Sequence, residues 1–106
     1  MKNILSIAIM ALIPSLAFSW DGVNSGKINT IEVTAGENFG FRISLVGGAA
    51  LCGTEHRWAY INQSASNYQT YVAVLLAAKM AEKSVSVFTV KRGANGYCEI
   101  GHISVQ

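Results

Sequence analysis

One helical segment constrains the fold of this 106-residue chain more than any other feature. Apolar residues at helical spacing predict a helix from Ser66 to Lys83, with Ser66 as its N-cap and Gln69 in the capping-box position. From Val72 to Ala78 no residue is polar, whereas a helix on the surface of a small domain normally keeps one polar face. Either the alanines tolerate exposure, or a second face is buried in an oligomer. For the second case we assign the interface to Val72, Leu75, Leu76 and Lys79.

Segments of alternating polarity on both sides of the helix predict β-strands. Three precede it, at Lys27–Ala35, Phe39–Leu45 and Arg57–Asn62, and two follow it, at 84–89 and Tyr97–Val105. The order β-β-β-α-β-β with mainly β structure predicts a five-stranded Greek-key barrel of the OB type. Within the last strand the apolar phase shifts after Ile100, which predicts a bulge at Gly101. The turn formers in Trp20–Gly26 predict a loop before the first strand.

The first nineteen residues have the pattern of a signal peptide. Lys2 precedes an apolar run from Ile4 to Leu12, and Ala17-Phe18-Ser19 resembles a signal peptidase site. The run is shorter than a membrane-spanning helix, although a retained anchor is the alternative. We therefore expect residues 1–19 to be removed and residues 20–106 to form one exported domain, secreted or periplasmic, with no membrane span.

Charge and motifs argue against two broad classes of function. The formal net charge is only +2, and the one basic pair, Lys91-Arg92, is no nucleic-acid-binding cluster. No nucleophile-elbow or paired-carboxylate signature is present, and His56 and His102 have no catalytic partner at a motif spacing. We therefore expect a binding protein without nucleic-acid partners, enzymatic activity or cofactors.

Two cysteines, Cys52 and Cys98, lie in the predicted mature domain. A small exported domain commonly needs a covalent crosslink, so the spacing and compartment favour a disulfide. A zinc site is the alternative, because a histidine follows each cysteine four positions later, at His56 and His102. This spacing is unusual for zinc and export favours oxidation, so we expect the disulfide and no metal.

Several motifs occur in the same order as in a known family of toxin subunits. They are Trp20-x-Gly22, Ser25-Gly26, Phe39-x-Phe41, Trp58-Ala59 and Lys83-Ser84-Val85-x-Val87. With them, residues 20–106 resemble the OB-fold B subunits of bacterial toxins that assemble one A with five B chains. The likeness is closer to the B subunits of subtilase cytotoxin and typhoid toxin than to those of cholera toxin. Cholera-type subunits resemble the chain mainly in a helix followed by two final strands.

The resemblance implies a function and a set of site residues. The family forms rings of five B subunits that bind cell-surface glycans and carry an enzymatic A subunit, with the helices facing a central pore. Ser25 occupies the position of a serine that helps to bind sialylated glycans, and Thr89 stands where the relatives present a tyrosine. Trp20 offers a ring that can stack on a sugar.

We therefore expect a secreted, non-enzymatic subunit that binds glycans as a homopentamer from a Gram-negative bacterium. Its ligand-binding residues are Ser25, Trp20 and Thr89. The alternative is a periplasmic interaction protein, such as an enzyme inhibitor or immunity protein on the same barrel. Trp58 and Tyr60 are expected in the core or an interface, because they lie in a predicted strand.

Overall fold

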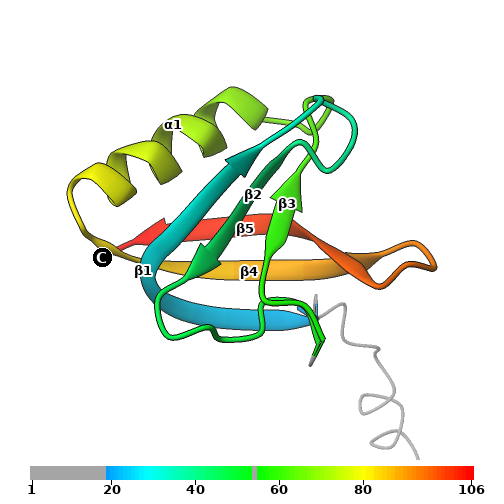
Figure 1. Cartoon of the computed structure of the whole chain (residues 1–106), viewed down its shortest axis with the longest axis horizontal. Coiled ribbons are helices and arrows are strands. Elements are labelled where there is room, and N and C mark those ends of the chain that lie inside the picture. The colour runs from blue at the N-terminus through cyan, green and yellow to red at the C-terminus, as the bar shows by residue number, and fades with distance from the viewer. Residues whose placement is uncertain (1–18, 54) are drawn as a thin grey trace, which may run out of the picture.

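A computed structural model describes residues 19–53 and 55–106, so the predicted signal peptide lies outside the described residues except for Ser19. The described chain forms a closed five-stranded barrel with one helix, which confirms the predicted fold class (Figure 1). In chain order the elements are β1 Gly22–Val33, β2 Phe41–Leu45, β3 Ala59–Ile61, α1 Tyr68–Met80, β4 Ser84–Arg92 and β5 Tyr97–Val105. Around the barrel the strands run β1-β2-β3-β5-β4. No helix among the described residues is long and apolar enough to cross a membrane.

The long first strand closes the barrel because its two halves pair with different neighbours. Gly22–Lys27 pairs with β4, and the half from Ile28 to Val33 pairs with β2. The register with β2 shifts by one residue at Asn29, where a bulge lets the strand bend sharply (Figure 1). The prediction of a loop at Trp20–Gly26 is therefore wrong from Gly22 onward. Pairing with β4 outweighs the local turn preference of these residues.

The bulge predicted at Gly101 is confirmed. Phe88 of β4 faces His102 of β5, whereas the next residue, Thr89, faces Ile100, so Gly101 is the extra residue. The Tyr71 hydroxyl donates a hydrogen bond to the Gly101 carbonyl oxygen over 2.9 Å, which ties α1 to the bulge. Burial raises the pKa of Tyr71, and the Glu99 carboxylate adds to this shift.

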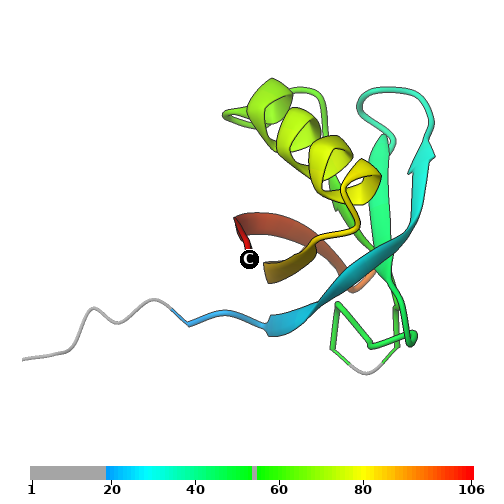
Figure 2. The same ribbon diagram turned by 90° about the vertical axis from the view of Figure 1, so that its left-hand side faces the viewer.

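The barrel interior is filled by apolar side chains from every strand and from the helix. Figure 2 shows the helix lying beside the strands of the barrel. Its buried apolar members are Ile28, Phe41, Ile43, Leu45, Leu51, Ala59, Ile61, Leu75, Ala78, Val85, Val87 and Ile100. Leu75 and Ala78 are the buried residues of α1, with Tyr68, Tyr71 and Val72 packed partly against the same core. The helix therefore closes the barrel with one face and leaves the opposite face outside.

The helix begins later than predicted. Asn67, with φ of 62°, is the N-cap and makes no side-chain capping bond, so the predicted Ser66 cap and Gln69 capping box do not form. Asparagine tolerates the left-handed conformation better than most residues, which allows a tight turn before Tyr68. At the other end Glu82 has φ of 55°, and the Lys83 amide donates to the Ala78 carbonyl oxygen over 2.9 Å. This left-handed turn ends the helix at Met80.

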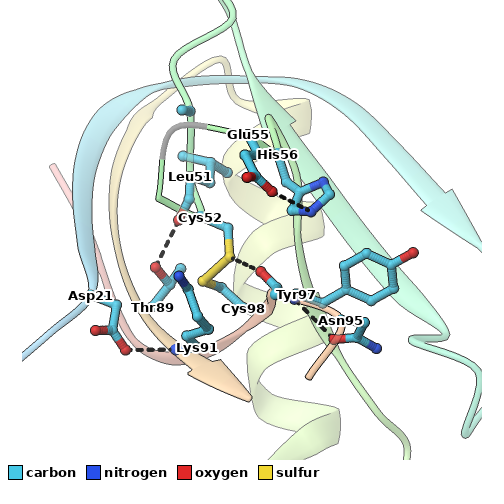
Figure 3. Close-up of a disulfide and its surroundings, with 12 residues drawn as sticks. Asp21, Leu51, Cys52, Glu55, His56, Thr89, Lys91, Asn95, Tyr97 and Cys98 are labelled. Carbon is cyan, nitrogen blue, oxygen red and sulfur yellow. Dashed lines mark hydrogen bonds and ion pairs between the residues drawn. A yellow bond between two sulfur atoms is a disulfide. The ribbon is translucent and has the colours of Figure 1, made fainter. Parts of the chain in front are cut away.

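The predicted disulfide is present. Cys52 and Cys98 are joined with a Cα–Cα distance of 5.2 Å, and both are buried (Figure 3). The bond links the loop before β3 to the beginning of β5, next to the shortest strand pairing of the barrel. There the parallel pairing of β3 with β5 consists of Tyr60 opposite Glu99. Both thiols are consumed, and the described residues contain no cluster of three metal-ligating side chains, so the zinc alternative is not supported.

Candidate functional site: the outer face of β1, β4 and β5

Strand alternation divides the side chains of β4 between the core and the surface. Val85, Val87 and Thr89 are buried, while the residues between them face outward. Ser86 lies opposite Ser25 of β1, and their hydroxyl oxygens share a hydrogen bond of 2.7 Å. The structure thus places Ser25 on the surface, as a ligand-binding serine requires.

A cluster of rings lies on the same side of the sheet. The Trp20 ring packs edge-to-face on Phe88 with centroids 5.5 Å apart, and lies 6.3 Å from the ring of His102. Phe88 and His102 are themselves 4.9 Å apart. The indole can come this close because of Gly101, where a β-carbon would lie 2.7 Å from Trp20 Cζ3. The bulge at Gly101 therefore makes room for the indole.

Ser25 and Trp20 reach one continuous surface through β4. Their contacts on that strand, Ser86 and Phe88, are two residues apart, which corresponds to about 7 Å along a strand. We call this surface the outer face and define it by Trp20, Ser25, Ser86, Phe88 and His102. Hydroxyl groups can both donate and accept hydrogen bonds, and the rings offer apolar contact beside them. A ligand with hydroxyl groups and an apolar side, such as a sugar ring, matches this combination.

Thr89 does not belong to the outer face. It is fully buried, and its hydroxyl donates a hydrogen bond to the Leu51 carbonyl oxygen over 2.7 Å (Figure 3). A β-carbon on Gly22 would lie only 2.6 Å from the Thr89 hydroxyl oxygen. Any larger residue at position 22 would therefore collide with Thr89. The prediction that Thr89 contacts a sugar is therefore wrong, because the Thr89 side chain points from β4 into the barrel. The outward ring of this strand is Phe88.

The predicted oligomer-interface residues separate into two groups. Leu75 is fully buried in the barrel core and Val72 packs partly against it, so Leu75 is removed from the proposed interface. Leu76 is 44% exposed and Lys79 is exposed, as an interface on the outer side of the helix requires. The structure adds Met80, which is 83% exposed. Leu76 and Met80, together with the exposed Ala73 and Ala77, form an apolar outer stripe on α1.

Sequence reasoning missed Ser86, Phe88 and His102 as members of the site. Alternation in β4 already placed Ser86 and Phe88 on one side of the strand, but it did not show which side faces the solvent. His102 reaches Phe88 only because of the bulge at Gly101.

No protein-family model, no curated protein and no solved structure matches the chain.

Proposed function

We propose that this protein is an exported, non-enzymatic subunit that binds cell-surface carbohydrate through its outer face. The observation that carries the proposal is the convergence of Ser25 and Trp20 on one surface, next to the rings of Phe88 and His102. Sugars bind through hydrogen bonds to their hydroxyl groups and through stacking of their C–H faces on aromatic rings. The resemblance to toxin B subunits points to sialylated glycans as the first class to test. The disulfide fits an oxidising compartment outside the cytoplasm.

A glycan array followed by titration calorimetry tests this proposal. We expect at least one cell-surface glycan to bind, and Ser25→Ala to weaken that binding up to about tenfold, the usual scale for one lost hydrogen bond. Trp20→Ala is expected to weaken it further because it removes the stacking surface. Ser66→Ala, an exposed serine before α1, is the matched control and should bind like the wild type. A bound glycan whose affinity is unchanged by both Ser25→Ala and Trp20→Ala would contradict the proposal.

We propose in addition that the subunits assemble into a ring, and two strand edges that have no partner strand among the described residues support this. The Thr34 amide donates to the Gly40 carbonyl oxygen and so points toward β2. Backbone N–H and C=O groups alternate in direction along a strand, so those of the preceding residue, Val33, point away from β2. The amide of Gln106 likewise donates to Ser84 of β4, so the backbone groups of Val105 point away from β4. Two different edges on one molecule allow head-to-tail contacts, and such contacts form a ring when the rotation between neighbouring subunits closes.

The outer stripe of α1 provides a test of assembly. Wild-type mature protein is expected to be oligomeric at micromolar concentration in light scattering, and the resemblance points to five subunits. Leu76→Glu is expected to shift it to monomer while the circular dichroism spectrum stays unchanged, because the added charge would be buried in the interface. Gln69→Glu, at an exposed position of the same helix, should leave the size unchanged. A folded Leu76→Glu variant of wild-type size would mean that α1 only plugs the barrel, and a monomeric wild type would contradict ring assembly.

The apolar outer stripe is also what a heteromeric partner would cover. A monomeric wild type that binds no glycan would favour the second candidate, a periplasmic inhibitor or immunity protein. An enzymatic A subunit is the further partner that the resemblance suggests, and a toxin-like enzyme encoded next to this chain would support it.

A further inference from the structure

A second group of rings lies outside the barrel, on the outward side of β3. Its members are Phe39, His56, Trp58, Tyr60 and Tyr97, which we call the β3 ring cluster. Tyr97 contacts three of the others, at centroid distances of 4.7 Å to Trp58, 4.9 Å to Phe39 and 5.1 Å to His56. The cluster is separate from the barrel core, since Ala59 and Ile61 on either side of Tyr60 point inward. Along β5, Tyr97 is about 15 Å from His102 of the outer face.

The cluster contains a backbone position that is unfavourable for its residue. Phe39 has φ of 54°, a left-handed conformation that bulky residues rarely adopt. Two hydrogen bonds hold it there, from the Phe39 amide to Asn62 Oδ1 over 2.7 Å and from Arg42 Nε to the Phe39 carbonyl oxygen over 2.8 Å. Glycine or asparagine would adopt this backbone with less strain. The position therefore retains an aromatic ring at a conformational cost, as is typical of ligand-contacting sites.

Arg42 presents a fixed positive charge beside these rings. Its guanidinium donates to the carbonyl oxygens of Phe39 and Asn38, the latter over 3.1 Å, and lies 4.8 Å from the centre of the Trp58 ring. Among the described residues no carboxylate lies within 4.0 Å of it. Glu32 faces Arg42 in the strand register without forming an ion pair. A guanidinium held in one orientation, with N–H groups left over, is suited to a planar carboxylate.

Tyr60 adds a hydroxyl at the edge of the cluster. Only 4% of the residue is exposed, and burial raises its pKa, with a further increase from Glu99 and a smaller decrease from Arg92. Among residues 19–53 and 55–106 every fully buried side-chain N or O atom has a hydrogen-bond partner, and the Tyr60 hydroxyl has no partner within these residues. This hydroxyl therefore reaches the solvent, where it can bind a ligand hydroxyl.

We propose that the β3 ring cluster and Arg42 form a second binding site, which takes a sugar ring that carries a carboxylate. Arg42 binds the carboxylate, the rings contact the C–H side of the sugar, and Tyr60 hydrogen-bonds one of its hydroxyl groups. This site shares no residue with the outer face, so either site can fail in experiment while the other holds.

Nitrogen-15 NMR titration of the mature protein with glucuronic acid tests the second site. The Arg42 Nε–H and Trp58 indole N–H signals are expected to shift with glucuronic acid, and glucose and acetate are each expected to bind at least about tenfold more weakly. These two controls remove the carboxylate and the ring, respectively. Equal affinity for glucose, equal affinity for acetate, or no shift at saturating sugar would overturn the proposal. Tighter binding of N-acetylaspartate than of glucuronic acid would also overturn it, in favour of an acidic protein partner.

Variants separate binding from folding at this site. Arg42→Lys keeps the charge but loses the planar donor set, and is expected to weaken glucuronic acid binding about tenfold. Phe39→Asn suits the left-handed backbone while removing the ring, so it is expected to fold and to bind more weakly. Glu32→Gln removes the nearest opposing carboxylate on the neighbouring strand and should bind at least as tightly as the wild type. Ser25→Ala should change nothing here. Unchanged affinity in both Arg42→Lys and Phe39→Asn would overturn the assignment of these residues.

Discussion

Replacing both Cys52 and Cys98 by alanine is expected to lower the free energy of unfolding by about 3–4 kcal/mol, in the chain-entropy account of disulfides. The bond spans 46 residues of sequence, so its loss frees a long loop in the unfolded chain. It also ties the loop before β3 to β5. The strands β3 and β5 are otherwise paired through Tyr60 and Glu99. For a domain of this size such a loss is a large share of the total stability.

Urea denaturation of the variant and of the wild type, oxidised and reduced, measures this effect. The reduced wild type should resemble the double-alanine variant, because both lack the crosslink. A decrease below about 1 kcal/mol in both would show that the disulfide contributes little to closing the barrel.

Leu75→Ala is expected to destabilise the fold by about 2–5 kcal/mol, the range for a buried leucine that leaves a cavity. Leu75 is fully buried and is one of two buried residues through which α1 packs on the barrel. Thermal or urea unfolding followed by circular dichroism checks the size of the loss.

Leu76→Ala is the matched control on the same helix. Leu76 is 44% exposed, so its truncation should change the stability of the isolated subunit by only about 0.5 kcal/mol. Measuring both variants under conditions that keep the protein monomeric separates packing within the subunit from contacts between subunits. Equal losses for the two variants would mean that α1 does not pack on the barrel through Leu75.

The element order and the crosslink could be predicted because they depend on local patterns. Period-two alternation identified the strands, and the phase change in β5 located the bulge at Gly101 before any pairing was known. The cysteine pairing followed from the number of cysteines and the expected compartment. These features need no knowledge of which strands are neighbours.

Features that depend on tertiary pairing were not accessible in the same way. Alternation shows that Phe88 and Thr89 lie on opposite sides of β4, but only the closed barrel shows that Thr89 points inward. Gly22–Gly26 has the composition of a loop and becomes a strand because β4 supplies its hydrogen-bond partners. The helix pattern likewise marked Leu75 and Leu76 as apolar without showing which one faces the barrel.

The candidate site combines both kinds of information. Ser25 was predicted from the resemblance and Trp20 from the ability of its ring to stack on a sugar, and in the structure both contact the outward side of β4. His102 could not be placed there from the sequence, because its contact with Phe88 requires the bulge at Gly101.

The central claim is that carbohydrate binds on the outer face, and the two tryptophans of the chain allow one direct measurement. Trp20 reports on the outer face and Trp58 on the β3 ring cluster, so their indole N–H signals distinguish the two surfaces in one NMR spectrum. The mature protein is titrated with the glycan that binds most tightly on the array. We expect the Trp20 signal to shift in proportion to saturation. Saturation of the protein with an unchanged Trp20 signal would contradict the claim.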